Sequence, residues 1–142
     1  MLDVNSASVQ SYLTILQDVI SRMAKNSTNA KGWCIALVSA IVVVIADKGR
    51  PEYVWISMFP IALFLYLDAY YLGLERLFRG RYNEFVHKLH GRGVTVEDIV
   101  IVTPGNGLRM LASAALATLS LSVWPFYALL VTMLLLVRRL VL

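Results

Sequence analysis

The last third of the chain contains 28 consecutive residues, 110–137, that carry no charge. Two shorter apolar runs precede it, at residues 33–46 and 53–74. Overall, 58% of the residues are hydrophobic and only 15% are charged, whereas an ordinary soluble domain has about 25% charged residues. A soluble core built from 142 residues could not bury so much apolar surface. We therefore expect an integral membrane protein and not a soluble enzyme.

The three runs predict an all-α protein with three transmembrane helices. The first run has 14 residues, but Ala30 and Gly32 lengthen it, and Lys31 can extend its ammonium group to the interface. The second run would cover roughly 33 Å as a helix, which is enough for a bilayer. Two full spans would need about 40 residues, so the last run is interpreted as one long or tilted helix. A tight hairpin that turns at Pro125 is the alternative.

Residues 1–30 are expected to form a cytoplasmic amphipathic helix that ends in the polar run at residues 26–29. Apolar residues recur there at helical spacing, and the opposite face is polar: Val9, Tyr12, Leu13, Leu16, Val19, Ile20 and Met23. Such a helix packs on its own protein or on a partner subunit. A helix lying on the membrane surface would carry more lysine and arginine on its polar face.

Residues 31–92 are predicted to form a two-span hairpin whose second helix continues into the cytoplasm as a basic helical extension. Residues 93–107 are rich in β-branched side chains and end in a Pro-Gly-Asn-Gly turn, which predicts an extended loop or a short strand. Residues 108–142 then contain the C-terminal transmembrane helix.

The distribution of basic residues predicts the orientation in a bacterial inner membrane. Five basic residues, from Arg76 to Arg92, follow the second span, and three more precede the first span. Positive charge near span ends favours the cytoplasm, so the N-terminus and the basic extension are both expected there. A single C-terminal span would place Arg138 and Arg139 outside, against this rule, and this favours the hairpin alternative.

Motifs for catalysis are absent from the sequence. It contains no nucleotide-binding glycine loop, no paired-histidine metal motif and no nucleophile elbow. The single cysteine, Cys34, excludes an internal disulfide and a cysteine zinc cluster. His87 and His90 stand three residues apart, but no third ligand accompanies them. We expect no enzymatic activity, no metal site and no cofactor.

Asp68 is an ionisable residue inside an apolar run, which makes it a candidate functional residue. One interpretation is structural: a salt bridge or hydrogen bond to a neighbouring helix, with Arg76 or Arg109 as the partner. The other is a role in an ion pathway.

The basic extension permits two interpretations. Positive-inside bias and anionic lipid headgroups explain it without a specific ligand. Alternatively, it holds a phosphate-rich ligand, because arginine binds phosphate well. The candidate ligand-binding residues are Arg76, Arg79, Arg81, Lys88 and Arg92.

The first half of the last run carries a stripe of small residues, Ser113, Ala117 and Ser120. Small residues allow membrane helices to pack closely, and they also suit the wall of a narrow pore. In the pore interpretation, Leu121, Trp124 and Phe126 supply bulk near a constriction that stops ions by dewetting.

Three stretches together resemble a widespread group of small bacterial inner-membrane proteins. They are ISRMAKNSTNAKGW at residues 20–33, FLYLDAYYLGLERLFRGRYNEF at 64–85 and SVWPFYALL at 122–130. In that group an RMA-NS…KGW motif leads into a first span and an LDAYYL–ER–FR–Y signature ends the second. The likeness covers roughly residues 15–90, whereas residues 93–107 match poorly.

The resemblance implies the membrane effector of a Hailong-type anti-phage system. There, a nucleotidyltransferase makes a nucleotide or short-oligonucleotide signal, an oligodeoxyadenylate, that opens a membrane channel. The function expected is thus an oligomeric ligand-gated ion channel, most simply a tetramer, that depolarises the membrane. The alternative is a non-conducting membrane adaptor that recruits a cytosolic partner through the N-terminal helix. A secondary transporter is disfavoured, because the sequence shows no inverted repeats.

Overall fold

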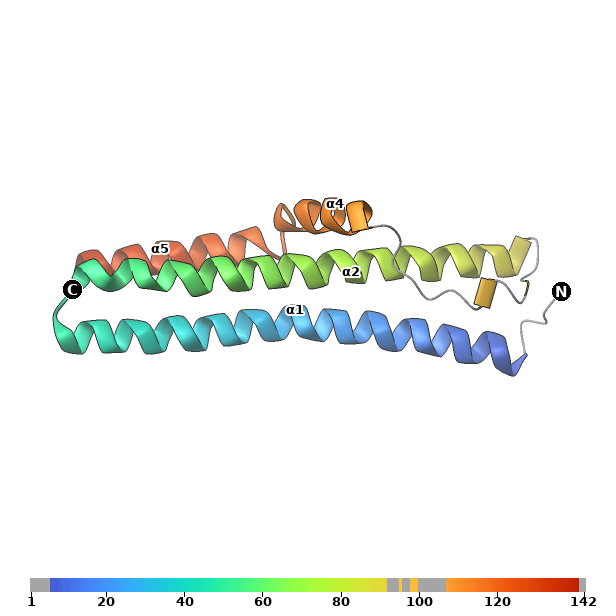
Figure 1. The fold of residues 1–142 in the computed structure, drawn as a ribbon, viewed down its shortest axis with the longest axis horizontal. Coiled ribbons are helices and arrows are strands. Elements are labelled where there is room, and N and C mark those ends of the chain that lie inside the picture. The colour runs from blue at the N-terminus through green and yellow to red at the C-terminus, as the bar shows by residue number, and fades with distance from the viewer. Residues whose placement is uncertain (1–5, 92–94, 96–97, 100–106, 141–142) are drawn as a thin grey trace.

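The computed structural model describes residues 6–91, 95, 98–99 and 107–140, and this part of the chain is helical without strands. The elements are α1 (Ala7–Lys48), the short 3₁₀ helix η1 (Pro51–Ser57), α2 (Met58–Gly91), α4 (Gly107–Thr118) and α5 (Trp124–Leu140). Figure 1 shows α1 and α2 as a long antiparallel hairpin, with α4 and α5 on the outer side of α2. The all-α fold class is confirmed.

The hairpin turns at Gly49, the one described residue with a positive φ. Its φ of 61° is left-handed, a conformation that glycine adopts without steric cost. The Gly49 and Arg50 amides donate hydrogen bonds to the carbonyls of Ala46 and Ile45, which closes the end of α1. Pro51 then begins η1. Pro60 lies in the first turn of α2, where its missing N–H costs nothing.

Two apolar clusters hold the helices together at opposite ends of the hairpin. Near the turn, α1, η1, α2 and α5 share a cluster that includes Cys34, Val54 and Val123. Towards the N-terminus, the apolar stripes of α1 and α2 bury each other, and the rings of Tyr12 and Phe85 lie 4.7 Å apart between centroids. Burial raises the pKa of Tyr12. The helix that begins in the second apolar run continues to Gly91, and its apolar face is buried against α1.

The first helix does not end at the polar run 26–29, so the predicted boundary at residue 30 is wrong. All 42 residues of α1 form one helix of about 63 Å. The polar side chains in the run are satisfied without a break: Thr28 donates to the carbonyl of Ala24, and Ser27 bonds across to α2. Because their hydroxyls have partners in the folded chain, these residues do not need to leave the helix for water.

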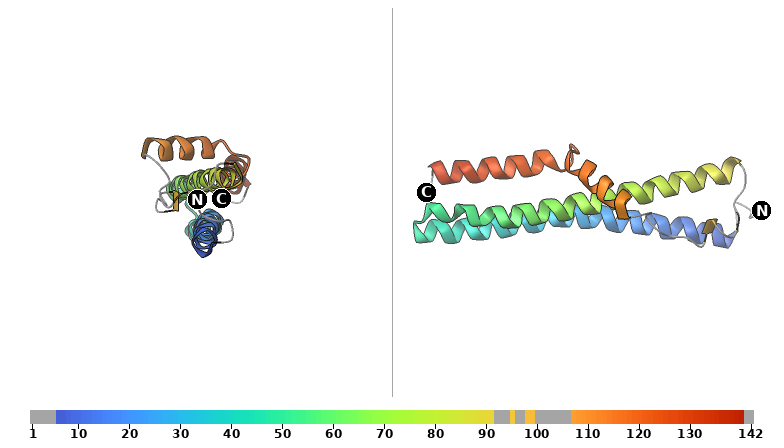
Figure 2. Two further views of the ribbon diagram at one scale, coloured as in Figure 1. Left: turned by 90° about the vertical axis from the view of Figure 1, so that its right-hand side faces the viewer. Right: turned by 45° about the horizontal axis from the view of Figure 1, so that its top comes forward.

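The last apolar run is not one helix, so that prediction is also wrong. It divides into α4 and α5 at residues 119–123, where Ser120 accepts backbone hydrogen bonds from Val123 and Trp124. The break falls just before Pro125, as a hairpin would require, but α5 does not fold back on α4. Figure 2 shows instead that α4 lies crosswise to the hairpin, whereas α5 runs along it. The small face of α4 packs on α2, and this contact replaces the straight continuation.

Most of the predicted loop or strand at 93–107 lies outside the described residues. Asp98 and Ile99 are described, and both are helical. Thr95 donates through its amide and its hydroxyl to the Asp98 carboxylate.

Two continuous helical segments, Ala7–Lys48 and Pro51–Gly91, are long and apolar enough to cross a membrane. Large apolar side chains on the hairpin and on α5 are more than half exposed. They include Trp33, Val43, Phe59, Leu129 and Leu136. Soluble monomers rarely expose so broad an apolar surface. The arrangement fits a bilayer around the turn end of the hairpin.

Candidate functional site at the membrane boundary

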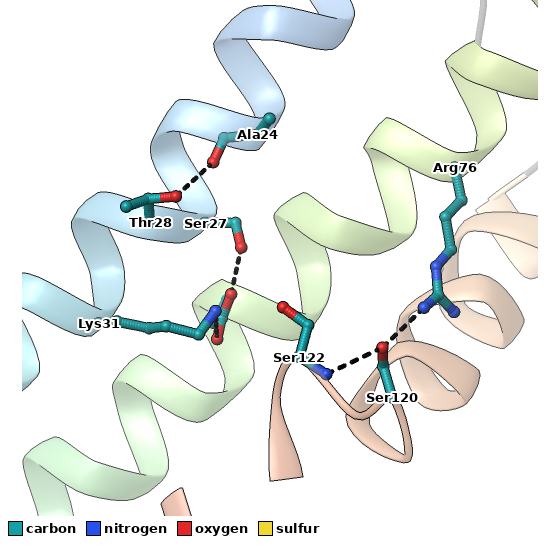
Figure 3. A network of polar contacts seen from close by, with 8 residues as sticks. Ala24, Ser27, Thr28, Lys31, Arg76, Ser120 and Ser122 are labelled. Carbon is teal, nitrogen blue, oxygen red and sulfur yellow. Dashed lines mark hydrogen bonds and ion pairs between the residues drawn. The ribbon is translucent and has the colours of Figure 1, made fainter. Parts of the chain in front are cut away.

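The Asp68 carboxylate on α2 is fully buried and is held by two residues of α1. The Ser27 hydroxyl donates to Oδ1, and the Lys31 ammonium lies 2.6 Å from Oδ2. Figure 3 shows Ser27 and Lys31 projecting from the same side of α1, one turn apart. Spacing of four residues places both on one face of a helix. The polar run that was expected to end α1 therefore supplies the partners of Asp68.

The neighbour-helix interaction predicted for Asp68 exists, with Lys31 and Ser27 of α1 as its described partners. Arg76 lies two turns along the same helix and bonds elsewhere, and the side chain of Arg109 is outside the described part of the structure. Lys31 retains 19% side-chain exposure, whereas Asp68 has none. The aspartate thus depends on the ion pair, while the lysine can still reach water along its own stem.

A third element also reaches this cluster. The hydroxyl of Tyr127 on α5 is buried near the Asp68 carboxylate and has no hydrogen-bond partner of normal geometry in the described residues. Tyr127 belongs to the apolar cluster near the turn. Three stretches that lie far apart in the sequence therefore contribute to one place: Ser27 and Lys31, Asp68, and Tyr127.

A second polar contact joins α2 to the break in the last run. The Arg76 guanidinium donates to the Ser120 hydroxyl at 2.8 Å, and the same oxygen accepts the Ser122 amide at 3.4 Å. Figure 3 shows these residues beside the Ser27–Lys31 cluster. The sequence placed Arg76 in a ligand site and Ser120 in a pore wall. In the folded chain the two residues touch.

The predicted small-residue stripe packs against α2. Ser113 donates to the carbonyl of Gly73 at 3.0 Å, and Ala117 is fully buried. A Cβ on Gly73 would lie 2.8 Å from the backbone nitrogen of Ala114. This glycine therefore allows the two backbones to approach closely.

The six predicted pore residues occupy different surroundings within one chain. Ser113 and Ala117 face α2 from α4, and Ser120 holds Arg76. Leu121 is 85% exposed and Trp124 51% exposed, while Phe126 packs beside the apolar cluster near the turn. A pore lined by all six would require α4 to leave α2.

The predicted ligand-binding residues do not share one face. From Arg76, Arg79 lies about 60° away around the helix and Arg81 about 140° away. Arg79 pairs with Glu75 at 2.6 Å. Lys88 pairs with Glu84 and Asp98, beside Arg81 and Tyr12. Arg92 lies outside the described residues. The basic extension thus divides into a pair near the middle of α2, Arg76 and Arg79, and a group nearer its C-terminal end, Arg81 and Lys88.

Near the end of α2, Lys88 binds Asp98 of the following segment. Hydrogen bonds from Thr95 and from Lys88 hold the pKa of Asp98 below its ordinary value of 3.8. The bond to Asp98 in turn raises the pKa of Lys88 above 10.5. Among the described residues, no three histidine, cysteine or acidic side chains gather as metal ligands.

Comparison with known proteins adds no assignment, since no family model, curated protein or solved structure matches the chain.

Proposed function

We propose that this chain is the subunit of an oligomeric ion channel in the bacterial inner membrane, opened by a nucleotide or short-oligonucleotide signal. The observation that carries the proposal is the Arg76–Ser120 hydrogen bond. It links a cation suited to phosphate directly to the turn that starts the last membrane helix. The N-terminus and the charged half of α2, residues 75–91, would face the cytoplasm, where such a signal is made.

The channel must be an oligomer. Around the turn, α1, α2 and α5 surround an apolar cluster of buried side chains, which leaves no room for a pore within one chain. In this proposal α5 is the third span: its 17 residues reach about 26 Å, the lower limit for crossing the hydrocarbon core. A ring of subunits, with a tetramer as the working state, would enclose the pathway and depolarise the membrane during phage infection.

Gating would follow from competition for Arg76. A phosphate oxygen makes a stronger, charge-assisted hydrogen bond to guanidinium than a serine hydroxyl does. A ligand that takes Arg76, with Arg79 beside it, would release Ser120 and the start of α5. Moving a population from 1:99 to 99:1 requires about 5.5 kcal/mol of preference for the open state. Contacts repeated around a ring can supply this difference.

The adaptor alternative has less support. It uses the apolar stripe of the N-terminal helix to recruit a partner, but Val9, Tyr12 and Leu16 are buried against α2. A partner would have to bind the polar faces of α1 or α2 instead.

Ion flux from liposomes that contain the purified protein tests the coupling, with short oligodeoxyadenylates as the probe. The wild-type chain should hold its gradient alone and release it when the probe is added. Arg76→Gln should raise the probe concentration required, by about tenfold or more if one charged hydrogen bond is lost. Ser120→Ala should lower it, because the contact that the probe must break is gone.

Ser122→Ala is the matched control, since no hydrogen bond of its hydroxyl joins it to Arg76. If Ser120→Ala and Ser122→Ala respond alike and Arg76→Gln responds as wild type, the Arg76–Ser120 contact does not gate. If no oligonucleotide opens the wild-type oligomer and the protein retains one cytosolic partner, the adaptor is correct.

A further inference from the structure

We propose that α4 is an in-plane helix at the membrane–water boundary, and that its outer face binds the lipid surface. This inference concerns the contact of α4 with the bilayer and does not depend on the channel proposal.

The first observation is that α4 has two apolar faces, of which only one is covered. Its inner face packs on α2 through Ser113, Ala114 and Ala117. Its outer face presents leucines that are 82%, 63% and 66% exposed: Leu108, Leu111 and Leu116. Three exposed leucines on one face of a short helix form an apolar patch of the kind that marks contact with a partner or a membrane.

The second observation fixes the depth of α4. It crosses α2 at Gly73, where the two backbones nearly touch. At this level the composition of α2 changes: residues 58–74 contain one charged residue, Asp68, whereas residues 75–91 contain six. Such a change marks the place where a membrane helix enters the aqueous phase.

The third observation is direction. In the end-on view of Figure 2, α4 extends sideways from the hairpin, and in the second view it crosses the hairpin obliquely while α5 runs along it. A helix that turns away from the spans at the boundary does not continue across the bilayer beside them. The 12 residues of α4 also reach only about 18 Å, which is too short to cross a hydrocarbon core of about 30 Å.

The lipid surface is the occupant that these observations favour over a second copy of the chain. Along the chain, the outer leucines are followed by the exposed Leu119 of the turn and the exposed Leu129 of α5. In this proposal these leucines face hydrocarbon, and the outer face of α4 is the end of that lipid-facing surface. Amphipathic helices at a membrane surface lie roughly 5–10 Å into the headgroup and acyl boundary.

Spin-label depth measurements on the full chain test the proposal in vesicles of phosphatidylethanolamine and phosphatidylglycerol. Cys34→Ala first removes the buried native thiol. Labels are then placed singly at Leu111→Cys and Ala115→Cys on the outer face of α4. Controls are Leu129→Cys on α5 and Asn83→Cys on the charged half of α2. The ratio of collisions with oxygen and with a polar nickel chelate reports depth.

Both α4 labels should lie at the headgroup boundary, shallower than Leu129→Cys and less accessible to nickel than Asn83→Cys. Three results would overturn the proposal. Labels as deep as Leu129→Cys would mean that α4 enters the hydrocarbon core. Labels as accessible to nickel as Asn83→Cys would mean that α4 lies outside the membrane. Immobilised labels shielded from both reagents would mean that a second copy covers α4. Agreement between the two positions shows that neither substitution itself displaced the helix.

Discussion

The Asp68 carboxylate has no solvent contact, so the free-energy cost of burying it depends on the two side chains that face it. Lys31 neutralises it from α1, and Ser27 supplies a hydrogen bond. The two residues of the ion pair are not equivalent, because only Lys31 keeps part of its side chain in solvent.

We predict that removing the lysine destabilises the protein more than removing the aspartate. Lys31→Met leaves a buried carboxylate without its counter-ion and should cost about 3–5 kcal/mol. Asp68→Asn keeps the shape and the Ser27 contact, while Lys31 turns to water, so its cost should be smaller. Unfolding in mixed micelles, followed by circular dichroism, measures both.

The double variant Lys31→Met/Asp68→Leu is the control for this asymmetry. With both charges gone, much of the stability lost in Lys31→Met should return. If the double variant is instead no more stable than Lys31→Met alone, the ion pair is not what stabilises this contact.

The importance of Asp68 could be predicted from sequence, whereas its partners could not. A carboxylate in an apolar run is costly wherever it lies, so the run alone identifies it. Its partners lie 37 and 41 residues earlier in the chain, and only the register of α1 against α2 brings them together. The available signal was the spacing of Ser27 and Lys31, which lie four residues apart and therefore share one face of a helix.

Among the elements, the crossing of α2 and α4 depends on one glycine. Gly73→Ala should displace α4 at a cost of about 1–3 kcal/mol, because the new methyl group would meet the Ala114 backbone. Gly80→Ala is the matched control on the same helix, since a Cβ there meets nothing within 4 Å. It should stabilise α2 by up to about 1 kcal/mol. Equal thermal stability of the two variants would exclude the close approach at Gly73.

The contact between α2 and the segment after it should depend on pH at both extremes. Asp98 has a lowered pKa in the folded chain, so its contribution is present above its ordinary value of 3.8 and is lost as the pH falls through the lower folded value. Lys88 has a raised pKa, so its contribution is present below 10.5 and is lost as the pH rises through the higher folded value.

Chemical shifts of the Thr95 amide should therefore stay constant across neutral pH and change in strong acid. Asp98→Asn should remove the acid transition. A transition that persists in this variant would belong to another carboxylate.

Element boundaries were predictable where periodicity alone decided them. The apolar stripe through Leu74, Phe78 and Phe85 predicted the extension of α2, because the same stripe forms the buried face. The continuity of α1 was missed, and the break before α5 was only the alternative prediction, since both depend on tertiary contacts. Polar residues 26–29 stay helical because Asp68 lies opposite, and the uncharged run breaks because α4 fits against Gly73.

At the scale of the whole molecule, α5 ends beside the α1–η1 turn, where Arg138 lies 5.1 Å from the Trp55 ring centroid. We predict that this end is periplasmic and that the N-terminus and Gly91 are cytoplasmic. Reporters fused before Ala7, after Gly91 and after Leu142 should read cytoplasmic, cytoplasmic and periplasmic. A cytoplasmic reading at the C-terminus would show that α5 does not cross.

The sequence predicted the membrane class from composition, but it could not predict what a single chain leaves uncovered. Leu121 and Trp124 were assigned to a pore wall, and in one chain they are exposed. Whether they face lipid or a neighbouring subunit depends on assembly, and the periodicity of one sequence carries no signal for that.

Single-channel recording of the purified protein in a planar bilayer tests whether the oligomer is an oligonucleotide-gated channel. The protein alone should pass no current. Discrete current steps of one size should follow when oligodeoxyadenylate is added on the side of Arg76 and Arg79, and native mass spectrometry of the same preparation should show one oligomer. An intact oligomer that stays silent with every oligonucleotide, or a preparation that contains only monomer, would contradict the channel.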